Sequence, residues 1–187
     1  VVLAAKVGVD AEETRRAYPR YAEVPFDSAY KFMATFHHLP STEGERFLAL
    51  VKGGPDVVLA RCSSVLNQDG STTPLDEVRD DVLAATRSMS EQGLRVLAFA
   101  VRDVAGQEQA VQQDPMSFVE DLTFVGMVGI IDPLRPSAIE AVSTAQSAGI
   151  EVRMITGDHA ITASAIGAEL GLGPGAISGA EIQTMSD

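Results

Sequence analysis

The sequence predicts a protein of the mixed α/β (α+β) class, in which an antiparallel sheet flanked by helices precedes a smaller segment of alternating strands and helices. The first observation is a pair of apolar and aromatic runs, residues 30–38 and 46–52, joined by a polar connection, which is typical of a β-hairpin. The second is a buried-strand pattern over residues 94–102. The third is the succession of strand-like and helix-like segments over residues 121–170, whose spacing indicates a right-handed parallel crossover.

The N-terminal part is expected to hold two short helices before the first strand. Residues 1–8 begin apolar without a capping residue, so we expect an excised piece whose first helix once extended upstream. Asp10 can cap a helix over residues 10–18, which Pro19 would end. Strand character then begins at residues 21–26.

Two glycines mark the next change from strand to helix. Lys52 ends a predicted strand, and Gly53 with Gly54 permits a turn or a close backbone approach. Pro55 suits the first position of a short helix. The order of these residues differs from a Walker P-loop, so on its own this stretch predicts only a strand-to-helix turn.

A longer helix is expected after a polar turn at Asp69-Gly70. Thr73 can cap this helix, with Pro74 at its first position, and Gly93 would end it. One of its faces is predicted to be core, namely Val78, Val82, Ala85 and Met89. Residues 104–116 are polar and rich in Gln, which predicts a surface excursion between strands.

The most suggestive single turn follows the predicted strand 152–155. It places Thr156, Gly157 and Asp158 before a helix over residues 159–170, at the end of the sheet where open α/β proteins bind ligands. A hydroxyl, a glycine and the free N–H groups of a helix start can meet a phosphate. An ordinary capped helix start explains the same tripeptide without any ligand.

Composition limits the classes of function. The chain has 187 residues and 45% hydrophobic content, enough for one good core or one core and a smaller unit. No apolar run approaches the roughly 18 to 20 residues that span a bilayer, and there is no signal peptide, so the piece itself is expected to be soluble. A net charge of −12 argues against binding to nucleic acid or anionic membranes. The single Cys62 excludes an internal disulfide, and the three His are not grouped with it at metal-ligand spacing, so no metal site is expected.

Four short sequences occur in order: Lys-Gly-Gly-Pro-Asp at 52–56, Gly-Leu-Arg-Val-Leu-Ala at 93–98, Asp-Pro-Leu-Arg at 132–135 and Met-Ile-Thr-Gly-Asp at 154–158. Together they resemble the cytoplasmic part of P-type cation-transporting ATPases, especially the type II, calcium-pump-like branch. The resemblance covers nearly all of the chain. It implies that residues 1–130 are an N-terminally truncated nucleotide-binding domain, and that residues 131–187 are part of a Rossmann-like, haloacid-dehalogenase-type phosphorylation domain.

The resemblance also implies roles for individual residues. The family has a Phe followed by a Lys and then a Met at the spacing of Phe26, Lys31 and Met33, and its Phe stacks on adenine. By the same resemblance, Lys31, Lys52 and Arg95 would neutralise or orient the nucleotide. The implied nucleotide-binding set is Phe26, Lys31, Lys52, Gly53, Arg95, Thr156, Gly157 and Asp158. Asp132, Pro133 and Arg135 would form the hinge between the domains. Calcium pumps often carry an Arg two residues after the Phe, where this chain has Ser28.

The residues themselves leave plainer alternatives open. Phe26 can be a core ring, Lys31 a solvated side chain, and Arg95 a partner of the preceding helix end. The connector at residues 132–136 can be an ordinary interdomain turn.

The chemistry implied by the family is transfer of the ATP γ-phosphoryl group to an Asp carboxylate, with Mg²⁺ neutralising charge, to drive cation transport. The Asp-Lys-Thr-Gly-Thr sequence that carries this Asp is missing, so the chain holds no catalytic residue of its own and is expected to be inactive alone. The parent pump would be a plasma-membrane protein with this part on its cytoplasmic face. Its partners would be the membrane and actuator domains, and the cation, which cannot be identified here, would bind elsewhere. A haloacid-dehalogenase-like phosphatase fragment and a non-enzymatic nucleotide-binding module remain as alternatives.

Overall fold

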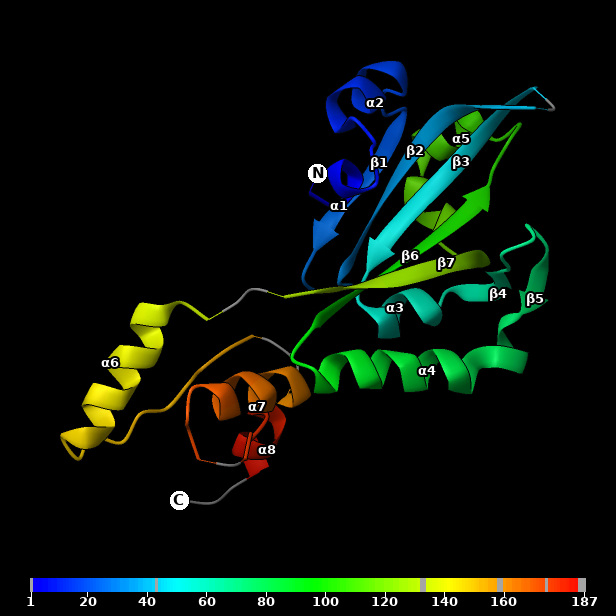
Figure 1. Cartoon of the computed structure of the whole chain (residues 1–187). Coiled ribbons are helices and arrows are strands. Elements are labelled where there is room, and N and C mark those ends of the chain that lie inside the picture. Colours follow the sequence, from blue (N-terminus) through cyan, green and yellow to red (C-terminus); the bar gives the residue numbers. More distant parts are fainter. Residues whose placement is uncertain (1, 43, 132–133, 158–159, 174, 185–187) are drawn as a thin grey trace. The chain divides into compact units, whose positions relative to one another are not determined.

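The computed structural model describes residues 2–42, 44–131, 134–157, 160–173 and 175–184 (Figure 1). These residues form two compact units. The first contains residues up to Asp80 together with Leu97–Met127, and the second contains Asp81–Val96 and the residues from Val128 onward.

A mixed seven-stranded sheet organises the protein, with the strand order β1-β2-β3-β6-β7-β4-β5. The strands are β1 (Ala22–Asp27), β2 (Phe32–Ser41), β3 (Gly44–Gly53), β4 (Cys62–Leu66), β5 (Thr72–Pro74), β6 (Arg95–Asp103) and β7 (Leu122–Ile130). The pairs β1–β2, β2–β3, β3–β6 and β4–β5 are antiparallel, and β4 pairs with β7 in parallel. The predicted fold class, α/β (α+β) with a sheet flanked by helices, is confirmed, and the sheet departs from the predicted antiparallel order in the parallel β4–β7 pair.

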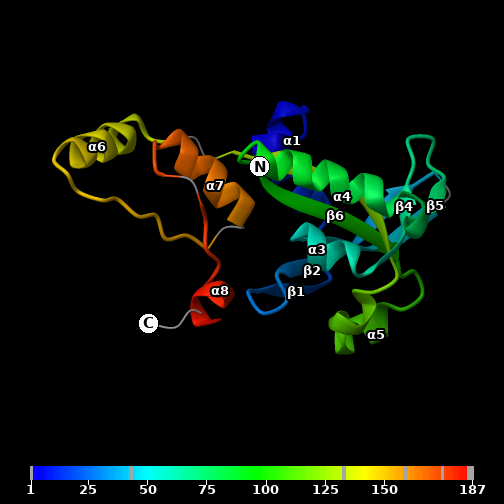
Figure 2. The ribbon, with the colours of Figure 1, turned by 90° about the horizontal axis from the view of Figure 1, so that it is seen from below.

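The sheet of the first unit has one covered face and one open face. Alternate residues of its strands are buried: Phe32, Ala34 and Phe36 of β2, Phe47, Ala49 and Val51 of β3, and Ala98 and Ala100 of β6. The buried side chains of α3 (Pro55–Leu59), α5 (Glu108–Gln113) and the 3₁₀ helix η1 (Pro115–Phe118) complete this core. Figures 1 and 2 show α5 against one side of the sheet. The residues between the buried positions therefore make up the open face.

The helix predicted over residues 10–18 forms as α2 (Ala11–Ala17), after a short α1 (Val2–Lys6). Asp10 is its N-cap, because its carboxylate accepts hydrogen bonds from the backbone N–H groups of Glu12 and Glu13 at 2.8 and 3.0 Å. These two hydrogen bonds lower the pKa of the Asp10 carboxyl, and the bond from the Glu13 N–H has the larger effect.

Two expectations for the first unit are wrong. Thr73 and Pro74 do not start the long helix: they belong to β5 and pair with Val65 and Ser64 of β4, so α4 begins at Leu75 (Leu75–Glu91). The Asp69 carboxylate accepts hydrogen bonds from the Ser71 N–H and hydroxyl, which stabilise the turn between β4 and β5. This turn leads residues 72–74 back beside β4 before the helix begins. Residues 104–116, predicted as a surface excursion, contribute to the core, because Val104 and Val111 are fully buried.

The second unit contains α6 (Pro136–Ser147), α7 (Ala160–Glu169) and α8 (Gly179–Thr184), besides most of α4. The strand predicted at residues 152–155 is absent: residues 151–156 have no regular structure, and Ile155 is 99% exposed. A strand needs a neighbour to accept its backbone hydrogen bonds, and none of the described residues beyond Ile130 forms one. The predicted parallel crossover is therefore wrong for this chain.

Candidate functional site

Phe26 lies in a β-bulge at the end of β1. The ladder between β1 and β2 pairs Val24 with Ala34 and Asp27 with Phe32, so Pro25 and Phe26 together oppose the single residue Met33. Phe26 is 63% exposed, which rules out the alternative of a core ring. A large exposed ring held by a bulge is a feature that a ligand can use.

Lys52 lies in the same cross-strand row. It pairs with Met33 of β2 on one side and with Phe99 of β6 on the other. Residues directly opposite each other in an antiparallel ladder point to the same face, so Met33, Lys52 and Phe99 share the open face. The row brings an aromatic bulge, a flexible thioether, an ammonium group and a second ring to one end of the sheet.

Lys31 reaches this end of the sheet from the turn between β1 and β2. Its backbone has a positive φ of 56°, and its N–H donates to the Asp27 carbonyl at 2.7 Å. Its own carbonyl accepts the N–H of Gly54 at 3.1 Å, so this turn and the turn after β3 are joined. Within the described part of the chain, neither Lys31 nor Lys52 forms an ion pair, and both side chains are exposed. Two cations are thus available to an anion in a chain of net charge −12.

Gly53 is required by the same close approach. A Cβ built on Gly53 would lie 2.6 Å from the Phe32 Cβ, 2.7 Å from the Lys31 carbonyl oxygen and 2.8 Å from the Phe32 Cα. Two of these atoms belong to the backbone and the third is the Cβ of Phe32, so none of them can move aside as the end of a flexible side chain can. Gly53 therefore lets β3 pass over the turn that carries Lys31.

The remaining predicted residues belong to the second unit or lie outside the described residues. Arg95 begins β6 and is exposed. Thr156 is the last residue of the irregular segment 151–156, and Gly157 follows it. Arg135 precedes α6 in an extended conformation, with φ −69° and ψ 130°, as expected before Pro136. Asp132, Pro133 and Asp158 lie outside the described residues.

A family model described as "P-type ATPase, cytoplasmic domain N" matches residues 1–137, more than half of the chain. The chain belongs to the P-type ATPase family. The resemblance to P-type cation-transporting ATPases is thereby confirmed.

Relatives that transport different cations match at similar levels. The cation-transporting ATPase pma1 of Synechocystis sp. is 40% identical over 97% of this chain. Calcium-transporting ATPase 1 of Lactococcus lactis is 34% identical over 97% of the chain, and the human potassium-transporting ATPase alpha chain 2 is 36% identical over 87%. The chain spans 20%, 20% and 16% of these three relatives, so it corresponds to about a fifth of a P-type ATPase or less. None of the helices in the described ranges is long and apolar enough to cross a membrane.

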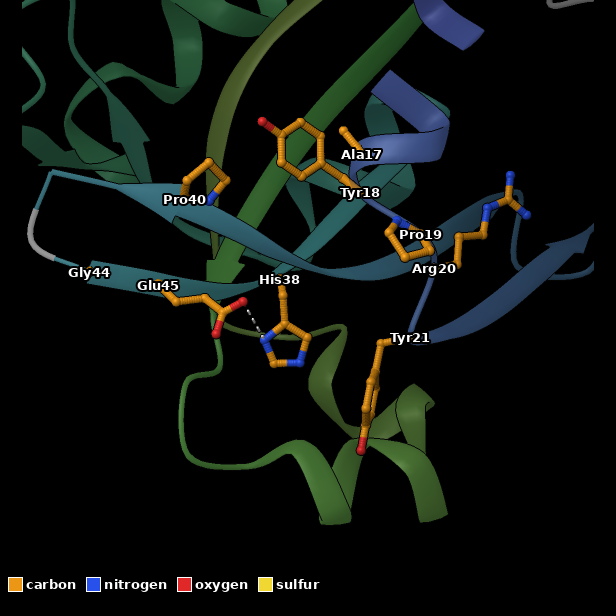
Figure 3. A pocket seen from close by; sticks show the side chains of 9 residues that line it. All are labelled: Ala17, Tyr18, Pro19, Arg20, Tyr21, His38, Pro40, Gly44 and Glu45. Carbon is orange, nitrogen blue, oxygen red and sulfur yellow. Dashed lines mark ion pairs between the residues drawn. The ribbon is translucent and has the colours of Figure 1, made fainter. Parts of the chain in front are cut away.

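One pocket that the described residues line lies away from the Phe26–Lys52 row. Figure 3 shows this pocket, of about 560 Å³, between the end of α2 and the β2–β3 hairpin. The pairing of His38 with Phe47 lies five residues along the ladder from that of Met33 with Lys52, roughly 17 Å away. The Arg20 guanidinium at this pocket is already paired with Glu23 at 2.6 Å. The pocket is therefore less suited to a phosphate than the open end of the sheet.

His37 and His38 are hairpin residues, as the sequence predicts. The His38 ring stacks on Phe47 at 4.6 Å and approaches Glu45 at 3.6 Å, and His37 Nδ1 lies 3.0 Å from the Tyr18 carbonyl oxygen. Among the described residues, no group of three His, Cys, Asp or Glu side chains is arranged to hold a metal ion.

Cys62 is a buried thiol, and we expect it to be inert in the folded protein. Burial raises its pKa to about 12, against the opposing effect of the positive charge of Arg79, and its Sγ lies 3.2 Å from the Val58 carbonyl oxygen. Because the thiolate is the nucleophile, only about one thiol in 10⁴ would be ionised at pH 8. Iodoacetamide labelling followed by mass spectrometry should show almost no reaction until denaturant is added. Equal labelling rates with and without denaturant would contradict this placement.

Proposed function

We propose that this chain is the ATP-binding part of an ion-pumping P-type ATPase, which uses ATP to form an aspartyl phosphate and to move a cation across a membrane. The observation that supports the proposal most is the row formed by the Phe26 bulge, Met33 and Lys52, with Lys31 on the adjoining turn. An exposed ring beside a thioether suits a purine, and ammonium groups that form no ion pair with any described residue suit phosphates.

In this proposal each residue has a distinct task. Phe26 stacks on the adenine, while Lys31 and Lys52 approach the ring system or the phosphates. Gly53 contributes by allowing the two turns to meet, and need not touch the nucleotide. Arg95, Thr156, Gly157 and Asp158 would act on the phosphate side.

The proposed domain division follows the sequence. Residues 1–130 would be the nucleotide-binding domain and residues 131–187 part of the phosphorylation domain, with the hinge at Asp132, Pro133 and Arg135. Mg²⁺ would accompany the ATP phosphates and neutralise charge during transfer, but we assign no residue of this chain as its ligand.

The phosphorylated Asp, the membrane helices and the cation site would be supplied by other parts of the pump. The relatives named above differ in the cation of their names although they match at 34–40% identity, which supports the view that this region does not select the ion. We therefore propose that this part, on the cytoplasmic face of the membrane, binds ATP without hydrolysing it alone.

The chain contains three lysines, which makes a direct test available. Lys31 and Lys52 lie at the proposed site, and Lys6 lies in α1 and serves as an internal control. We expect ATP to slow acetylation of Lys31 and Lys52 by an amine-reactive ester, as measured by mass spectrometry, while Lys6 reacts at an unchanged rate. Equal rates for all three lysines at saturating ATP would reject the proposed site.

A further inference from the structure

One side chain ties the Phe26 bulge to the core. The Tyr30 hydroxyl donates a hydrogen bond of 2.6 Å to the carbonyl oxygen of Pro25, the residue that precedes Phe26 in the bulge. The Tyr30 ring lies 4.7 Å from the ring of Phe32, centroid to centroid, and Phe32 is fully buried. Tyr30 thus has its ring on the core and its hydroxyl on the bulge.

The segment between Phe26 and Lys31 is closed by further bonds at its base. The Asp27 carboxylate accepts the N–H of Ala29 at 2.7 Å, and the Asp27 carbonyl accepts the N–H of Lys31, also at 2.7 Å. These bonds fix the turn but do not reach the bulge residues, which fall between the register pairs of β1 and β2. The Tyr30 hydroxyl supplies the link from the fixed turn to the bulge.

We propose that Tyr30 is a positioning residue for nucleotide binding, which acts by holding the backbone at Pro25 so that the Phe26 ring is presented for stacking. This inference rests on the proposed function, because it deepens the role of the same site. Phe26 is 63% exposed and gains little orientation from packing, so the backbone beneath it must supply the order. Ordering a ring before its ligand arrives removes a cost of binding.

The test is a double-mutant cycle with ATP as the probe. Tyr30→Phe removes the hydroxyl and keeps the ring on Phe32. We expect it to raise the ATP dissociation constant about three- to tenfold, the effect of losing one hydrogen bond. In a Phe26→Ala background the same substitution should have no further effect, because Tyr30 acts through Phe26. Tyr21→Phe, a matched hydroxyl deletion at the other end of β1, should bind ATP like the unaltered chain.

The outcomes separate this inference from the function on which it rests. Binding by Tyr30→Phe equal to that of the unaltered chain would overturn the inference and leave the proposed function standing. An equal loss with and without Phe26 would also overturn it, since a general loss of structure would then explain the effect. An amide NMR spectrum with changes confined to residues near the turn should accompany the expected result. Failure of the unaltered chain to bind ATP would defeat the proposed function, and the role of Tyr30 with it.

Discussion

Replacing Gly53 with Ala is expected to lower the free energy of unfolding by about 2 to 3 kcal/mol, the upper range for forcing an extra carbon into a packed site. The new Cβ would lie 2.6 to 2.8 Å from the Lys31 carbonyl oxygen, the Phe32 Cα and the Phe32 Cβ. Relief requires β3 to move away from the turn at Lys31, which also strains the bond from the Gly54 N–H to the Lys31 carbonyl.

The neighbouring glycine offers a matched control. A Cβ on Gly54 would meet only the Asp56 Oδ1 closely, at 2.7 Å, and that oxygen is the end of a flexible side chain. The backbone at Gly54, with φ −58° and ψ 140°, suits alanine, so Gly54→Ala should change stability by less than about 0.5 kcal/mol. Urea unfolding of both variants measures the difference. Equal stabilities would show that Gly53 is not needed for the close approach.

Replacing Phe26 with Ala is expected to weaken ATP binding while leaving the stability of the fold unchanged. Stacking of a base on an aromatic side chain contributes about 1 to 3 kcal/mol, so the dissociation constant should rise about five- to 150-fold. Because the side chain is 63% exposed, the free energy of unfolding should change by less than about 0.5 kcal/mol. Isothermal titration calorimetry and urea unfolding of the same samples separate the two effects.

Two further substitutions sharpen this prediction. Met116→Ala removes another exposed apolar side chain, 40% exposed and in η1, and should leave ATP binding unchanged. Phe26→Trp preserves an aromatic face and introduces the only Trp in the chain. Its fluorescence should respond to ATP with retained affinity. Unchanged affinity in Phe26→Ala, or no fluorescence response in Phe26→Trp, would remove Phe26 from the site.

The strands that carry Phe26 and Lys52 could be predicted because their pattern is local. Alternation and turn residues mark the β2–β3 hairpin within about 20 residues of sequence. The row from Met33 through Lys52 to Phe99 could not be predicted in the same way, because it depends on the pairing of β3 with β6, which are far apart in the chain. Sheet order is a property of the whole fold.

The predictions that are wrong concern segments whose local sequence is compatible with two different structures. Thr73 and Pro74 suit a helix start, yet they complete a hairpin with β4 because the Asp69 turn returns the chain there. Residues 152–155 have the composition of a strand, but composition does not supply a partner to bond with. The hydrogen bond from the Tyr30 hydroxyl to the Pro25 carbonyl could not be predicted, because no local sequence pattern indicates such a contact.

The most direct test of the central claim is an ATP titration of the unaltered chain, followed residue by residue by NMR. We expect saturable binding with a dissociation constant of about 1 mM or tighter, and chemical-shift changes grouped on the bulge, its turn and the row beside it. These are Phe26, Tyr30, Lys31, Met33, Lys52 and Gly53. No saturable change at millimolar ATP, or shifts grouped around Tyr18, Arg20 and His38 in the pocket of Figure 3, would contradict it.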